Sequence, residues 1–279
     1  MADKGRIAFI FEGERRELNY CKKLVSAFFP GREVEQLLLH ADENIYMLYE
    51  ELCADESLNV IDVVRERNKE NAEALEGKSA QDFQEVYLFF DLDRHQDNIP
   101  TESAVTAEEL IGKMLAFFDN ETEQGKLYIS YPMCEALRDM RKGECAAYYK
   151  CRLPLSESGD YKRLSGDGNP LVDYRKYDKA YWKTAAAVFL HRCRCLYNAA
   201  VEPENLYEWY KAADISPTGI FETELELFQR DREVHVLSAF PEFLLDYFKV
   251  DCSQDLKAHL PGISNERCDR RRNGQNNRT

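Results

Sequence analysis

The stretch that decides the fold is Arg6-Ile-Ala-Phe-Ile-Phe-Glu-Gly13. Its continuous apolar run, residues 6–11, predicts a strand buried on both faces, as the strands of a parallel sheet are. Glu12 ends this strand. Residues 14–29 then predict an amphipathic helix, because apolar side chains recur at spacings of three and four: Leu18, Cys21, Val25 and Phe28.

The same alternation of apolar runs and amphipathic stretches continues along the N-terminal half. Strands are predicted at residues 34–39, 86–90 and 126–130, and helices at residues 43–53 and 106–118. A further helix is predicted to begin at Pro132, because proline is favoured in the first helical turn. Residues 55–82 are charged and weakly periodic, which predicts helix and loop. This order predicts an α/β fold, in which a mostly parallel sheet carries helices on both faces.

The character of the sequence changes near residue 144. Residues 155–178 are polar and contain glycine, which predicts a long loop. Helices are predicted at residues 179–198, 203–231 and 239–248, and a strand at residues 233–238. Two arrangements fit this pattern. Either residue 144 divides two domains, or it opens a helical insertion after which the last strand returns to the first sheet.

We therefore divide the chain into three parts. Residues 1–143 are predicted to form the α/β domain, and residues 144–262 a mainly helical region. Residues 263–279 form a basic tail rich in asparagine, whose composition predicts disorder.

The composition is that of a globular protein: 279 residues, 44% hydrophobic and 32% charged. There is no run of about 18 apolar residues and no secretory signal in residues 1–5, so we expect a cytoplasmic protein that does not enter membranes. The nine cysteines are odd in number and irregular in spacing. We expect them to be reduced, and their spacing fits no structural zinc site.

The net charge of −14 argues against tight, unaided binding to nucleic acid, which normally needs a basic face. Basic residues gather at only a few places: Arg138 to Lys142, Arg192 with Arg194, and the tail at residues 267–272. If the chain acts on nucleic acid, we expect a partner to present the substrate to it.

Carboxylates occupy equivalent positions after three predicted strands. Glu12 follows the first strand, Asp91 and Asp93 follow the strand at residues 86–90, and Glu135 opens the helix after the fourth strand. Functional groups of open α/β sheets lie at the carboxyl ends of the strands, so these side chains can converge. Convergent carboxylates are what Mg²⁺ or Mn²⁺ requires. A single such carboxylate is more often a cap or turn residue.

Two of these segments resemble the two halves of the Toprim signature, namely Ile7-Ala-Phe-Ile-Phe-Glu-Gly13 and Val86-Tyr-Leu-Phe-Phe-Asp-Leu-Asp93. Toprim domains occur in topoisomerases, bacterial primases and OLD-type nucleases. The chain is most similar to the RloB/AbiLii-like group of phage-defence proteins. That similarity rests on the segments Glu12 to Tyr20, Phe90 to Arg94 and Ile129 to Glu135, within residues 6–142.

The resemblance implies a role for each carboxylate. Glu12 would be the general acid or base, Asp91 and Asp93 would hold the metal, and Glu135 would be a fourth carboxylate. It also implies an effector that an ABC-type or AAA-type ATPase controls, and the chain itself encodes no P-loop. The interval between Glu12 and Asp91 is long for the family. Neither a zinc ribbon nor a recognisable tyrosine nucleophile is present, which favours a nuclease over a primase or topoisomerase.

Other residues could contact a substrate. Arg94 and Arg138 could bind phosphate, because guanidinium groups match it in a bidentate way, or could be ion-pair partners. His95 could contact phosphate or a metal-bound water, or could be an ordinary loop histidine. Aromatic side chains at residues 207–210 could stack on a base, although such spacing more often indicates core packing.

The leading hypothesis from the sequence is a Mg²⁺- or Mn²⁺-dependent nuclease acting in anti-phage defence. Its substrate would be DNA or RNA, including tRNA, and the pattern is compatible with a homo-oligomer. The rival hypothesis is a non-catalytic module, whose acidic cluster holds a structural metal or binds a basic partner.

Overall fold

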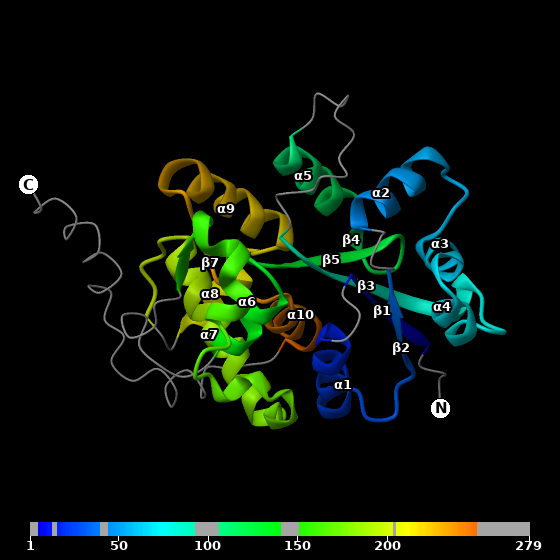
Figure 1. Ribbon diagram of the computed structural model, residues 1–279, viewed down its shortest axis with the longest axis horizontal. Coiled ribbons are helices and arrows are strands. Elements are labelled where there is room, and N and C mark those ends of the chain that lie inside the picture. Colours follow the sequence, from blue (N-terminus) through cyan, green and yellow to red (C-terminus); the bar gives the residue numbers. More distant parts are fainter. Residues whose placement is uncertain are drawn as a thin grey trace, which may run out of the picture. The chain divides into compact units, whose positions relative to one another are not determined.

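The computed structural model describes residues 5–12, 16–39, 44–92, 106–140, 151–202 and 205–249 (Figure 1). These residues form two compact units. Unit 1 lies within Met1–Cys134 and Tyr177–Lys179, and unit 2 within Glu135–Lys176 and Ala180–Thr279. The boundary expected at residues 143–144 and the tail at residues 263–279 both lie outside the described residues.

Unit 1 is built on a five-stranded sheet in the order β2-β1-β3-β5-β4. The strands are β1 (Arg6–Phe11), β2 (Val34–Leu38), β3 (Phe83–Asp91), β4 (Asp119–Asn120) and β5 (Gly125–Ser130). All neighbours pair in parallel except β4, a two-residue strand that pairs antiparallel with β5 and that the sequence did not predict. The predicted α/β class with a mostly parallel sheet is therefore confirmed.

The helices of unit 1 surround this sheet. They are α1 (Arg16–Phe28), α2 (Ile45–Ala54), α3 (Val60–Arg67), α4 (Lys69–Ala74) and α5 (Ala107–Phe117), with a short 3-10 helix η1 (Ala80–Asp82). The step from β1 to β2 runs in the opposite direction to the later steps, so right-handed crossovers place α1 on one face and α2 and α5 on the other. Figure 1 shows this arrangement of α1, α2 and α5.

The helices begin where polar side chains can accept a backbone N–H. Asn44, Asn59 and Asn68 cap α2, α3 and α4 in this way. Thr106 forms a capping box with Glu109 at the start of α5, in which each side chain binds the backbone N–H of the other residue. These local signals explain why the predicted helices start close to the observed positions.

Aromatic side chains fill the interior of unit 1. The Phe89 ring stacks against Phe11 and Tyr128, with centroids 5.4 and 5.8 Å away, and meets Phe9 edge to face at 5.4 Å. Phe9 also meets Phe29, which follows α1, edge to face at 5.8 Å. These rings come from three neighbouring strands and from the residue that follows α1, so they join the central strands to the end of that helix.

Asn71 of α4 satisfies the backbone beside the edge strand β2. Its Oδ1 accepts the Leu38 N–H at 3.0 Å, and its Nδ2 donates to Leu38 O at 2.6 Å and to Val64 O at 2.9 Å. The side chain is only 2% exposed. Edge strands leave backbone groups without a sheet partner, and this amide supplies partners at Leu38.

We expect Asn71→Ala to lower the free energy of unfolding of unit 1 by about 2–3 kcal/mol, because the Leu38 N–H and Val64 O lose this side chain as a partner, while Leu38 O keeps a bond from Asn68 Nδ2 at 2.9 Å. Denaturant unfolding of the variant and the parent protein measures the difference. A loss below about 0.5 kcal/mol, typical of a surface substitution, would show that water replaces the amide at no cost.

Unit 2 is mainly helical, as predicted. Its longer helices are α7 (Lys179–Leu196), α8 (Leu206–Ala212), α9 (Pro217–Asp231) and α10 (Ala239–Phe248), and its short helices are η2 (Cys134–Asp139), η3 (Leu155–Asp160), α6 (Tyr161–Leu164), η4 (Pro170–Val172) and η5 (Tyr174–Lys176). The first residues of α7 and η2, Lys179 and Cys134, still belong to unit 1. The long loop predicted at residues 155–178 is therefore wrong, because short helical turns occupy most of it.

Two further predictions are corrected. The strand β7 (Glu233–His235) does not return to the main sheet, but pairs antiparallel with β6 (Arg152–Pro154) in a separate two-stranded sheet. Pro132 does not begin a helix: it follows a cis peptide bond after Tyr131, and the helix that comes next, η2, is a 3-10 helix.

Several charged and aromatic residues of unit 2 are structural. Arg192 is 4% exposed and donates to Val236 O at 2.5 Å and to Asp139 O at 2.9 Å, so it forms no basic surface. Tyr207 and Tyr210 are buried, and the Tyr207 hydroxyl donates to Lys249 O at 2.6 Å. These tyrosines therefore take the core-packing role and not the base-stacking one. Among the described residues, no helix is both long and apolar enough to cross a bilayer.

Candidate functional site

The carboxyl edge of the unit 1 sheet carries the residues that the sequence singled out. β1 and β3 are parallel neighbours, with Phe11 paired to Phe89, so Glu12 and Asp91 lie at the same edge of the sheet. Asp91 itself is the last residue of β3 and pairs with Ser130 of β5. It is thus part of a strand, whereas the sequence placed it just after one.

This edge contains the topological switch point of the sheet. The chain leaving β1 moves to β2 on one side, and the chain leaving β3 moves towards β5 on the other side. The loops that leave such a pair of strands diverge, and this opens the crevice in which α/β proteins bind ligands. Glu12 and Asp91 follow these two strands.

Three possible ligand groups meet beside this point. A carboxylate oxygen of Glu17, a carboxylate oxygen of Asp91 and the sulfur of Cys134 all lie within 4.8 Å of one another. Glu17 is 5% exposed and Cys134 is 6% exposed, while Asp91 is half-buried. The donors come from the first turn of α1, the end of β3 and the start of η2, which follow or end three adjacent parallel strands.

The sequence contained a signal for Glu17 that the motif search passed over. Glu17 lies on the buried stripe of α1 together with Tyr20, Cys21 and Leu24. A carboxylate in an apolar stripe is costly to bury unless it has partners, so such a residue is a candidate for a site. Its place in the first helical turn also suits a negative charge, because of the helix dipole.

Cys134 had no comparable signal, because an isolated cysteine is usually a small hydrophobic core residue. No disulfide joins the cysteines of the described residues. Only the folding of unit 1, to which Cys134 belongs, brings this sulfur near the carboxylates.

The other predicted site residues have different surroundings. Among the described residues, the cluster includes neither Glu12 nor Glu135. Glu135 belongs to unit 2, where its Oε1 lies 4.0 Å from Lys162 Nζ. Arg138 is 4% exposed, and its Nη1 lies 3.4 Å from both Lys162 O and Ser165 Oγ. Asp93, Arg94 and His95 lie outside the described residues.

The donor set fits a divalent cation. Two carboxylates are hard oxygen ligands, as Mg²⁺ and Mn²⁺ require, and their mutual repulsion would be relieved by a cation between them. A thiolate is a softer ligand that Mg²⁺ rarely uses but that Zn²⁺ and other transition metals accept. When all three groups bind, the cluster therefore suits Zn²⁺ better than Mg²⁺, and when the two carboxylates alone bind it suits Mg²⁺ or Mn²⁺.

In comparisons with protein families, with curated proteins and with solved structures, nothing matches this chain.

Proposed function

We propose that the chain is a divalent-metal-dependent nuclease of Toprim-like type, which hydrolyses phosphodiester bonds of DNA or RNA, tRNA included. The observation that carries this proposal is the meeting of Glu17, Asp91 and Cys134 at the carboxyl edge of the sheet, beside its switch point. Glu12 ends the neighbouring parallel strand at the same edge. An acidic site on rigid strand ends is what metal-assisted phosphate chemistry requires.

In this proposal each described residue has a defined task. Asp91 and Glu17 hold Mn²⁺ or Mg²⁺, with Cys134 as a third donor. A bound cation would polarise the phosphate and make a water molecule more acidic. Glu12, on the strand next to Asp91, handles the proton as general acid or base. Asp93 and Glu135 remain proposed as further carboxylates, and Arg94 and His95 as phosphate contacts.

The biological setting belongs to the same proposal and rests on the sequence resemblance. It makes the chain a cytoplasmic effector of anti-phage defence under the control of an ABC-type or AAA-type ATPase. The net charge of −14 supports dependence on a partner, because an acidic protein repels nucleic acid at a distance. The burial of Arg138, Arg192 and Arg194 adds to this argument, since these cations do not form a basic face.

One observation favours a second candidate, a non-catalytic metal-binding module. Two of the three donors, Glu17 and Cys134, are almost completely buried, as the ligands of a structural metal are. Such a metal would stabilise the fold without reaching a substrate. The two functions differ in the role of Glu12: a nuclease needs it for cleavage, whereas a metal-binding module does not.

Glu12→Gln separates the two candidates. If Glu12 moves a proton, we expect this variant to lose about 10²- to 10⁴-fold of the Mn²⁺-dependent cleavage of a mixed DNA and RNA panel. Its rise in melting temperature on addition of Mn²⁺ should stay close to that of the parent, because the three clustered donors are intact. Glu56→Gln, in an exposed turn, is the matched control. Cleavage absent from the parent protein on every substrate, with Mn²⁺ stabilisation present, would support the module instead.

A further inference from the structure

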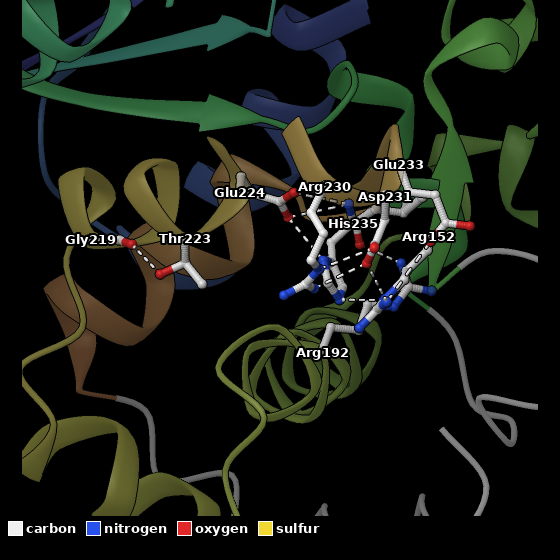
Figure 2. Close-up of polar contacts among 10 residues, drawn as sticks. Arg152, Arg192, Gly219, Thr223, Glu224, Arg230, Asp231, Glu233 and His235 are labelled. Atoms are coloured by element: carbon white, nitrogen blue, oxygen red, sulfur yellow. Dashed lines mark hydrogen bonds and ion pairs between the residues drawn. The ribbon is translucent and has the colours of Figure 1, made fainter. Parts of the chain in front are cut away.

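Unit 2 contains a completely buried pair of titratable groups that the proposed nuclease does not use. His235 of β7 and Glu224 of α9 are both 0% exposed. The Glu224 carboxylate accepts the His235 backbone N–H at 3.2 Å, and its Oε1 lies 3.2 Å from His235 Nδ1 (Figure 2). The Nδ1 atom does not align with the carboxylate as a hydrogen bond, so the contact is a close approach that a small ring rotation could turn into one.

An arginine contacts the other nitrogen of the imidazole ring. Arg152 Nε donates to His235 Nε2 at 3.2 Å. Arginine cannot accept a hydrogen bond, so Nε2 must accept with its lone pair, and this contact assigns the ring proton to Nδ1. A proton added to Nε2 would place two N–H groups face to face and break the bond to Arg152.

Arg152 has other partners to which it can turn. Its Nη1 lies 3.8 Å from Asp231 Oδ2 and 3.8 Å from Glu233 Oε2, at the surface end of the same network. The Glu224 carboxylate lies on the opposite side of the ring, 3.2 Å from Nδ1, where it can pair with an imidazolium. The network therefore has two arrangements, which differ by one proton on His235 and by the partner that Arg152 takes, and this is the requirement for a switch.

Other charged and titratable groups near the pair have partners or surroundings of their own. From α7, Arg192 donates to Val236 O, and the buried Cys193 thiol has its pKa raised by burial and by the Glu242 and Glu224 carboxylates. From α9, Arg230 binds Asp231 at 3.0 Å. None of these contacts involves the Nε2 atom of the imidazole.

We propose that His235, held between Glu224 and Arg152, is a proton-operated latch on the two-stranded sheet of β6 and β7. In the neutral state Arg152 ties β6 to the ring on β7. On acidification the ring pairs with Glu224, and Arg152 is released to Asp231 and Glu233. The tie is present at high pH and lost as the pH falls, so acid loosens this sheet while the rest of unit 2 stays folded.

The first test uses the unmodified protein. The imidazole ¹⁵N signals of His235 report its protonation, and amide hydrogen exchange reports the sheet, through Val236 N–H bonded to Cys151 O and Leu155 N–H bonded to Arg232 O. We expect the protection factors of these two amides to fall about three- to tenfold, the equivalent of one lost hydrogen bond, at the pH where His235 takes up its proton. A ring that stays neutral until unit 2 unfolds, or protection that does not change as the ring titrates, would overturn the proposal.

Two variants identify the partners. In Arg152→Met the amide protection should no longer follow pH, because the guanidinium that binds Nε2 is gone. In Glu224→Gln the fall in protection on acidification should be reduced, because the carboxylate that pairs with the imidazolium is gone. Arg175→Met, at an exposed arginine of the same unit that pairs with Asp173, is the control and should behave as the parent does. The same pH dependence of amide protection in the parent and in Arg152→Met contradicts the latch.

Discussion

Replacing Asp91 by asparagine is expected to reduce Mn²⁺-dependent cleavage by at least about a hundredfold. The same change should remove most of the stabilisation that Mn²⁺ confers on the parent protein. Asp91 is the member of the cluster that lies on the central strand β3, and its oxygen lies within 4.8 Å of the ligand atoms of both Glu17 and Cys134. An amide keeps the shape of the side chain but not its charge, so the cation loses one of its two clustered anionic carboxylates.

Thermal melts with and without Mn²⁺, run beside the cleavage assay, measure both effects. At a Mn²⁺ concentration of 100 times the dissociation constant, binding stabilises the parent by about 2.7 kcal/mol, which corresponds to a melting shift of about 5–10 °C. Asp119→Asn, an exposed aspartate on β4, should retain the full shift. If Asp91→Asn kept both cleavage and shift, the metal would have to bind elsewhere.

Phe89→Ala is expected to have the largest effect on stability, a loss of about 3–5 kcal/mol from unit 1. The Phe89 ring is 2% exposed and touches aromatic rings on both neighbouring strands. Its removal leaves a cavity among the aromatic rings on one face of the sheet, and the rigid strands cannot move to close it. Loss of this ring should also loosen the ends of β1 and β3, and so weaken metal binding.

Urea unfolding followed by amide exchange in β1 and β3 measures this loss for unit 1 separately from unit 2. Phe117→Ala is the matched control, because this ring of α5 is only half-buried and packs at the side of Tyr49 and Phe118. We expect its cost to be clearly smaller. Equal costs for the two substitutions would contradict the prediction, because the buried Phe89 ring would then contribute no more than the half-buried Phe117 ring.

Only the tertiary structure decided which elements outside the main sheet would meet. β6 and β7 have three residues each, too short for a periodic pattern, and they pair across the interval from Arg152 to His235. The sequence predicted one of these strands but not its partner. Arg192 looked like surface charge, yet it lies inside unit 2, because two buried backbone carbonyls there require a donor.

The sequence by itself determined the sheet of unit 1 and the edge that carries its carboxylates. Apolar runs at residues 6–11 and 86–90 specify strands buried on both faces, and connections through helices make them parallel, so Glu12 and Asp91 had to share an edge. The residues that join Asp91 in the cluster could not be predicted in this way. Glu17 and Cys134 reach it from a helix turn and a 3-10 helix whose distance from β3 depends on side-chain packing. Periodicity is a local property of the chain, whereas the meeting of three side chains from three elements is set by the packed core as a whole.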